Sequence, residues 1–161
     1  MDVNRHPGDA TKGPEDRFSG DVWLWPRIGA TRNAEVRNVL FTPGSRSAWH
    51  RHPAGQVLHV TEGVGVVQSR GGEREEIRAG DTVICHPGEE HWHGAAPGTF
   101  MTHIAVTDGP TEWHEHVTDD QYAFGEALIQ PGSVHLPPGE NAREAVGHEQ
   151  GDGGRGADGL D

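Results

Sequence analysis

The sequence has few cysteines, few basic residues and no long apolar segment. Cys85 is the only cysteine among 161 residues, which excludes an internal disulfide framework and a cysteine-rich zinc site. Lys and Arg number 13 against 25 Asp and Glu, and the resulting net charge of −12 argues against nucleic-acid binding. No apolar run approaches the roughly 18 residues of a membrane span, and residues 1–10 lack the apolar core of a signal peptide. We therefore expect a soluble, cytoplasmic protein without nucleic-acid or membrane partners.

Length and composition predict one folded domain between two loose ends. A chain of 161 residues suits one domain, and 24 glycines added to an apolar fraction of 32% reach the range of globular proteins. Residues 123–161 combine seven acidic and two basic side chains with many Gly and Pro residues. Such a segment cannot bury enough apolar surface to offset the entropy lost on ordering. We expect a flexible N-terminus over residues 1–12, one domain over 13–122, and a disordered acidic tail rich in Gly and Pro over 123–161.

Short apolar segments separated by turn residues indicate an all-β domain. Strands are predicted at Val36–Phe41, Val57–Thr61, Val64–Ser69, Glu75–Arg78, Thr82–Cys85 and Thr99–Thr107. Gly71 and Gly72 join the third and fourth of these strands into a hairpin. The segment Trp113–Tyr122 is the one helix candidate. Several short strands at this spacing imply a β-sandwich or a small barrel.

Histidines are concentrated in the expected domain, where nine of the twelve lie between residues 50 and 116. His50 and His52 are two residues apart, so on a strand both side chains project from the same face. Gln56 follows after a Pro-Ala-Gly turn, and His91 follows a later Pro-Gly turn. A His-x-His pair alone is more often two surface or core histidines than a pair of ligands. Three neutral imidazoles with one oxygen donor, however, form a divalent-metal site of the catalytic kind.

Two spaced motifs resemble those of the cupin family. The first runs Gly44-(five residues)-His50-Arg51-His52-(three residues)-Gln56-(six residues)-Gly63, and the second runs Gly80-(six residues)-Pro87-Gly88-(two residues)-His91. The resemblance implies an all-β cupin jelly-roll β-barrel with metal ligands on inward-facing strands. The family's ligand set of three histidines and a glutamate carries over to His50, His52, Gln56 and His91. Glutamine thus replaces glutamate, and Ala95 stands near the place of an expected asparagine.

A closer resemblance is to the small bacterial cupins associated with carboxymuconolactone decarboxylases, a group that includes the cupin hydroxynitrile lyases. It rests on the segments 48–53, 88–97, 101–103 and 115–122, and spans about residues 13–122. Those lyases hold manganese through three histidines and a glutamine, which implies Mn(II) here, with Fe(II) or Zn(II) as alternatives. The family habit also implies a homodimer or homotetramer. Because all four ligands are neutral, the metal would keep its full positive charge and stabilise an alkoxide, an enolate or cyanide.

The resemblance to the lyases also implies roles for individual residues. A histidine that matches His103 acts near the metal in those enzymes, and His93 matches another pocket histidine, so both are candidate catalytic residues. His103 is expected to be the general base, with a buried core histidine as the alternative interpretation. Arg37, Val39 and Thr107 are expected to line the substrate pocket. An inward Arg37 would require an anion, such as a carboxylate or an enolate, whereas a shifted strand register would leave Arg37 in solvent.

These features predict a metal-dependent enzyme that acts on a small molecule. The leading hypothesis is a lyase that resembles the (R)-selective hydroxynitrile lyases and combines a Lewis-acid metal with a histidine base. A cyclase, an isomerase or a dioxygenase of secondary metabolism is the alternative among enzymes. A non-catalytic cupin that binds a metal or a ligand is the alternative outside them, because a fold alone does not determine function.

Overall fold

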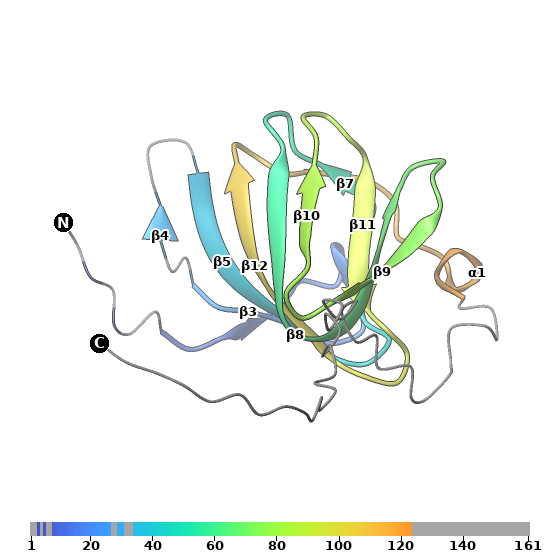
Figure 1. The fold of residues 1–161 in the computed structure, drawn as a ribbon, viewed down its shortest axis with the longest axis horizontal. Helices are drawn as coiled ribbons and strands as arrows, with labels where there is room; N and C mark the ends of the chain where they lie inside the picture. Colours follow the sequence, from blue (N-terminus) through green and yellow to red (C-terminus); the bar gives the residue numbers. More distant parts are fainter. Residues whose placement is uncertain (1–2, 4, 6–7, 27–28, 31–33, 124–161) are drawn as a thin grey trace, which may run out of the picture. The chain divides into compact units, whose positions relative to one another are not determined.

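Thirteen strands and one short helix make up the described part of the chain, which comprises residues 3, 5, 8–26, 29–30 and 34–123 of this computed structural model (Figure 1). These residues belong to one compact unit, Met1–Leu128. The tail predicted over 123–161 lies outside the described residues except for Ala123, and so does part of the N-terminus predicted to be flexible. Within that N-terminus, Thr11 and Lys12 pair with a later strand. In the described ranges, no helix has the length and apolar character that crossing a membrane requires.

The strands are short, with one exception of 14 residues. In chain order they are β1 (Thr11–Lys12), β2 (Phe18–Ser19), β3 (Val22–Leu24), β4 (Gly29–Ala30), β5 (Ala34–Phe41), β6 (Arg46–Ser47), β7 (His50–Arg51), β8 (Gln56–Ser69), β9 (Arg74–Arg78), β10 (Thr82–Cys85), β11 (His91–Ala95), β12 (Met101–Asp108) and β13 (Glu112–Trp113). Every strand pair between described residues is antiparallel. The all-β jelly-roll barrel expected from the sequence is therefore confirmed.

The long strand β8 belongs to both sheets of the barrel and joins them. Its first half pairs with β10 and β12, and its second half pairs with β9 and β11 (Figure 1). The prediction of two separate strands, Val57–Thr61 and Val64–Ser69, is wrong, because Gly63 bends the strand without ending it. Gly63 adopts φ +77°, and a Cβ there would lie 1.9 Å from the carbonyl oxygen of Phe100. Only glycine therefore allows β8 to bend at this crossing.

The helix predicted over Trp113–Tyr122 is also largely wrong. Helix α1 covers only Asp119–Tyr122, while Trp113 belongs to β13 and pairs with β7. The helix starts late because Thr118 and Gln121 form a capping box that fixes its N-terminus. Tyr122 then donates a hydrogen bond to the carbonyl oxygen of Ala95 over 2.7 Å and anchors α1 against the barrel.

Two apolar clusters stabilise the barrel on either side of the sheet that contains β11. One is packed inside the barrel around Phe41, Val60 and Met101. The other lies beneath α1 and contains Trp49 and Trp92, which pack edge to face with ring centroids 6.5 Å apart. The alternation of β11 therefore turns Trp92 away from its neighbours His91 and His93, and both faces of this strand are buried. The barrel also contains a cavity whose lining includes several histidines.

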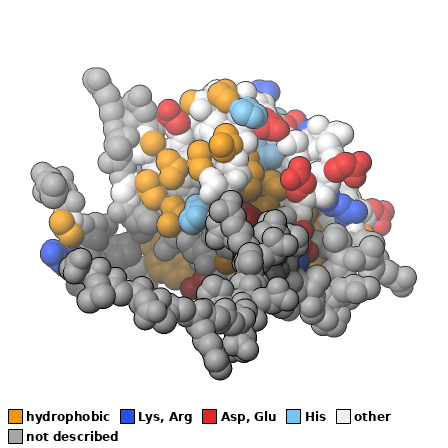
Figure 2. Space-filling model, viewed as in Figure 1, with side chains coloured by type: hydrophobic (Ala, Val, Ile, Leu, Met, Phe, Trp, Pro, Cys, Tyr) orange, Lys and Arg blue, Asp and Glu red, His pale blue; other side chains and the backbone are white. Residues whose placement is uncertain are grey.

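Hydrophobic side chains also gather on an outer face, over β5, β12, β8 and β10 (Figure 2). Val57 lies directly across from Ile84 on one side and from Val106 on the other, and all three side chains are exposed. The homodimer or homotetramer expected from the family resemblance stays a prediction, which light scattering of the purified protein measures directly.

Candidate metal centre

Strand pairing brings the two sequence motifs together at one point inside the barrel. His50 on β7 lies directly across from His91 on β11, and their ring centroids are 4.4 Å apart. His52 follows two residues after His50, with its ring 5.2 Å from that of His50 and 5.8 Å from that of His91. Gln56 opens β8, and its Oε1 lies 3.2 Å from Nε2 of His91. All four predicted ligands are buried within reach of one another.

Backbone carbonyl groups orient two of these imidazoles. Nδ1 of His50 donates a hydrogen bond to the carbonyl oxygen of Ala48, and Nδ1 of His91 donates one to that of Glu89, each over 2.9 Å. In a neutral imidazole the other nitrogen, Nε2, then carries the free lone pair. Nδ1 of His52 lies 3.3 Å from Oγ1 of Thr111, and its Nε2 has no partner among the described residues. Each ring thus keeps one nitrogen available for a metal.

The side chain of Gln56 points its amide oxygen, and not its amide nitrogen, toward the ring of His91. Nε2 of Gln56 donates to Oγ1 of Thr107 over 3.0 Å, which turns Oε1 of the amide toward Nε2 of His91. Because His91 already donates through Nδ1, two acceptors face each other across 3.2 Å. The reverse amide orientation would satisfy both groups without a cation, but the structure has the oxygen inward. This arrangement fits a divalent-cation site, in which Gln56 and His91 would be two of the ligands.

Burial keeps the histidines of this cluster neutral. It lowers the pKa of His52 and of His103 from 6.5 to about 4, because a charged ring there would lose its hydration. Burial also lowers the pKa of His50, of His91 and of His93, and neighbouring imidazoles lower those of His50 and His93 further. At neutral pH these rings therefore offer lone pairs, as metal binding requires.

His93 lies closer to the predicted ligands than its sequence position suggested. One ring nitrogen from each of His50, His91 and His93 falls within 4.8 Å of the others, and this group does not include His52. The ring of His93 is 5.2 Å from that of His50 and 5.0 Å from that of His103. His50 and His91 are thus shared by two overlapping sets of three imidazoles, one with His52 and one with His93.

His103 lies beside this cluster on β12. Its ring stacks on Phe41 with centroids 5.6 Å apart, and its side chain is fully buried. Neither ring nitrogen of His103 has a hydrogen-bond partner among the described residues, and Nδ1 of His93 also lacks one. Buried polar atoms in folded proteins are nearly always satisfied, so these nitrogens are suited to hydrogen-bond a substrate or a water molecule in the cavity.

A cavity of about 410 Å³ opens next to these nitrogens. Its inner end is formed by His50, His52, Gln56, His93 and His103, while His91 stands behind them against His50. Its walls are mostly apolar and include Phe18, Leu24, Val39, Phe41, Ala105 and Trp113. A largely apolar cavity with polar groups at one end is typical of a small-molecule site.

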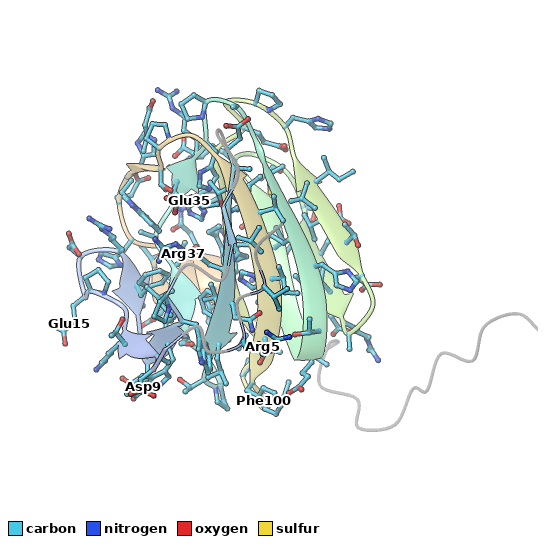
Figure 3. All side chains as sticks on the ribbon, turned by 90° about the vertical axis from the view of Figure 1, so that its left-hand side faces the viewer. Arg5, Asp9, Glu15, Glu35, Arg37 and Phe100 are labelled. Atoms are coloured by element: carbon cyan, nitrogen blue, oxygen red, sulfur yellow. The ribbon has the colours of Figure 1, made fainter. Side chains whose placement is uncertain are left out.

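The three predicted pocket residues all line this cavity. Val39 is buried directly across from His103, and Thr107 bonds Gln56 as described. Arg37 faces the cavity, but it is not a buried cation that lacks a partner. Its guanidinium donates from Nε and Nη2 to Oε2 of Glu35 over 3.3 Å and 3.2 Å, and the two side chains are 41% and 38% exposed (Figure 3). Sequence reasoning missed Glu35, although its position two residues before Arg37 places it on the same strand face.

The barrel and its buried histidine cluster define a cupin. The Cupin domain family matches residues 37–107, which contain both motifs and the strand with His103. The chain is also 50% identical over 129 residues to the (R)-mandelonitrile lyase of Granulicella tundricola, covering 76% of this chain and 98% of that relative. The chain therefore belongs to the cupin family.

Solved structures show the same fold. A cupin-like protein from Thermotoga maritima superposes with a TM-score of 0.68 at 39% identity, over 71% of this chain and 92% of that one. The polyketide cyclase RemF from Streptomyces resistomycificus superposes with a TM-score of 0.59 at 18% identity, over 76% of this chain and 91% of that one. The second likeness concerns the fold alone. It carries no argument for cyclase activity.

Proposed function

We propose that this protein is a metal-dependent lyase that cleaves small hydroxynitriles into a carbonyl compound and hydrogen cyanide. The observation that carries the proposal is the histidine cluster at the inner end of an apolar cavity, in a chain half identical to a mandelonitrile lyase. A lyase of this kind needs a base for the hydroxyl proton and stabilisation of negative charge. The neutral ring of His103 and the four proposed metal ligands support these two roles.

The proposed metal ligands are His50, His52 and His91 through ring nitrogens and Gln56 through its amide oxygen. Their neutral imidazoles and inward oxygen fit a divalent transition metal, and Mn(II) is the metal that we propose. When bound, such a cation supplies a Lewis acid that stabilises the negative charge developing on oxygen and on the departing cyanide.

His103 is proposed to move the proton. Because burial holds its pKa at about 4, the ring is neutral at pH 7 and can accept the proton of the substrate hydroxyl. As that proton leaves, the carbon–oxygen double bond forms and the bond to the nitrile carbon breaks, with its electron pair leaving as cyanide. The protonated ring, unstable in this buried site, then returns the proton to cyanide. Phe41, stacked on His103, holds the ring in place during both transfers.

His93 is proposed to assist without taking the proton itself. It lies between His50 and His103, with ring centroids 5.2 Å and 5.0 Å away, and its backbone N–H donates to Oγ of Ser47 over 3.2 Å. This position allows His93 to hydrogen-bond the substrate or to keep the ring of His103 in its orientation. We expect its loss to reduce turnover less than the loss of His103 does.

The experiment that tests the proposal follows benzaldehyde release from (R)-mandelonitrile by purified protein, before and after metal removal. We expect cleavage that disappears on metal removal, returns with Mn(II), and depends on His103. Cleavage that survives complete metal removal would contradict the metal-dependent lyase. Absence of cleavage with every cyanohydrin offered to the Mn(II)-loaded protein would also contradict it.

A further inference from the structure

The charged side chains that line the cavity carry a net positive charge, whereas the protein as a whole is acidic. The chain carries a net charge of −12. Among the described residues, the charged side chains lining the cavity are Arg17, Glu35 and Arg37, which gives the cavity an excess of one positive charge. An apolar cavity concentrates the field of such charges, so in an acidic protein this lining favours anions over neutral molecules.

Arg37 stands at a defined position relative to the histidine cluster. On neighbouring strands, Glu35 lies across from Thr107, which in turn lies across from Gln56. Two residues further along the same pair of strands, Arg37 lies across from Ala105. Strands in a sheet are about 4.8 Å apart, so Glu35 and Arg37 stand two strand spacings, roughly 10 Å, from the backbone of β8. The cavity therefore reaches from the histidines to Arg37 past the apolar side chains of Val39 and Ala105.

The ion pair of Arg37 leaves donor groups for a ligand. Nε and Nη2 both bond the single oxygen Oε2 of Glu35, and Nη1 has no partner among the described residues. Both side chains remain about two-fifths exposed, so their pairing is screened and contributes little to stability. A guanidinium held in this way at a cavity wall has a fixed orientation. It can bind a planar carboxylate by donating two parallel hydrogen bonds to it.

We infer that Arg37 determines substrate specificity by binding a carboxylate on the part of the substrate that lies away from the histidine cluster. The inference rests on the proposed lyase function and adds the class of substrate: a hydroxynitrile, and its carbonyl product, that carry a carboxylate. A phosphate fits less well, because Glu35 beside the guanidinium repels a dianion more strongly than a monoanion. The neutral parent compound, mandelonitrile, is then a poorer substrate than its carboxylated analogue.

The sequence offers a matched control for Arg37. Arg78 on β9 bonds one carboxylate oxygen of Glu76 through its own Nε and Nη2, with the carboxylate again two residues earlier on the same strand. Arg78 is 51% exposed and does not line the cavity. Arg78→Gln therefore removes the same kind of surface ion pair without touching the cavity, and Arg37→Lys keeps the charge without the bidentate geometry.

The first measurement compares affinities and needs no turnover. Isothermal titration calorimetry with 4-formylbenzoate and with the neutral 4-formylbenzamide is carried out on the Mn(II)-loaded wild type and variants. We expect the wild type and Arg78→Gln to bind the carboxylate at least about tenfold more tightly than the amide. Arg37→Gln should abolish this preference, and Arg37→Lys should retain part of it. Equal affinities in the wild type, or a preference that survives in Arg37→Gln, would overturn the inference.

The second measurement separates the inference from the lyase proposal. Cleavage of 4-carboxymandelonitrile is compared with that of its 4-carbamoyl analogue, and we expect kcat/KM to favour the carboxylate by about tenfold in the wild type and in Arg78→Gln, but not in Arg37→Gln. If cyanohydrins are cleaved without any such preference, the inference is wrong and the lyase proposal stands. If no cyanohydrin is cleaved but binding of 4-formylbenzoate still depends on Arg37, the lyase proposal fails and the carboxylate site stands.

Discussion

Gln56 and Thr107 are joined by a hydrogen bond of 3.0 Å in which the amide nitrogen of Gln56 donates to the hydroxyl oxygen of Thr107. This bond holds the Gln56 amide in one of its two possible orientations, because an amide can present either an oxygen or a nitrogen to the histidines. With its nitrogen held by Thr107, Gln56 presents its oxygen to His91. We propose that this neutral side chain is a metal ligand in the place where the family's usual pattern has a glutamate.

Replacing Thr107 by Val should weaken metal binding while leaving all four ligands in place. The valine cannot accept a hydrogen bond, so the Gln56 amide is free to turn its nitrogen inward. Loss of a group that orients a ligand lowers metal affinity by about 10- to 100-fold. Competition with a chelator measures the change, and Thr107→Ser, which keeps the hydroxyl, is the control. An unchanged affinity in Thr107→Val would show that Thr107 does not orient Gln56.

Single substitutions of the predicted ligands should remove the metal and leave the barrel folded. We expect about one metal per chain in the wild type and little in His50→Ala, His52→Ala or His91→Ala, as measured by mass spectrometry of the dialysed protein. His86→Ala changes an exposed histidine and is the control. His93→Ala distinguishes the two overlapping sets of imidazoles. Metal lost in His93→Ala and retained in His52→Ala would mean that His93 is the third ligand.

Removal of His103 should separate metal binding from proton transfer. His103→Ala should keep its metal, because the ring contacts Phe41 and His93 rather than the predicted ligands. It should lose about 100-fold or more of kcat, which is the range that a positioned general base supplies. Steady-state kinetics and metal analysis on the same preparation measure both quantities. Wild-type turnover in His103→Ala would remove this residue from the reaction.

The metal-free protein should lose stability as the pH falls from 7 toward 4. Burial lowers the pKa of His52 and of His103 to about 4, so between pH 6.5 and 4 the unfolded chain binds protons that the folded chain does not. Stability therefore decreases as pH falls through that window. We expect the melting temperature to drop by roughly 5 °C or more between pH 7 and pH 5.

Variants identify the groups responsible for this pH dependence. His103→Gln has no titrating ring at this position, so its melting temperature should depend less on pH than that of the wild type. His86→Gln, which changes an exposed ring, should follow the wild type. A melting temperature that stays constant from pH 7 to pH 4 in the metal-free wild type would contradict the burial of neutral histidines.

Truncation after Gly125 should leave folding, metal content and activity intact. The expectation rests on the composition of residues 123–161, which are rich in Gly, Pro and acidic side chains. Melting temperature and metal content of the truncated and full-length chains are compared under identical conditions. A large drop in melting temperature would mean that apolar residues such as Leu128, Ile129 and Val134 pack on the barrel.

Much of the fold could be predicted because Gly and Pro residues mark the turns between short apolar strands. The predicted strand boundary at Gly63 was wrong, because a glycine can either end a strand or allow it to bend. Gly63 resembles a strand end in the sequence, yet it allows β8 to bend and continue between two sheets, since its missing Cβ makes room for Phe100. That role depends on a residue 37 positions later, which local patterns cannot reveal.

The proximity of the four proposed ligands could be predicted from the two motifs, whereas their surroundings could not. His50 and His91 are 41 residues apart, and the family motifs pair them, as the strand register does. The bond between Gln56 and Thr107 and the closeness of His93 to His50 depend on how distant strands meet. The pairing of Arg37 with Glu35 could have been predicted from the sequence, because the two residues are two positions apart and lie on one face of one strand.

The most direct test of the account is a titration of Mn(II) into metal-free protein, with bound metal and (R)-mandelonitrile cleavage measured on the same samples. The account predicts that cleavage is absent at the start, rises in proportion to bound metal, and levels off at about one equivalent per chain. It also predicts that His103→Ala binds the same equivalent and remains inactive. Full cleavage before any metal is added, or saturation with metal without cleavage of any cyanohydrin by the wild type, would contradict the central claim.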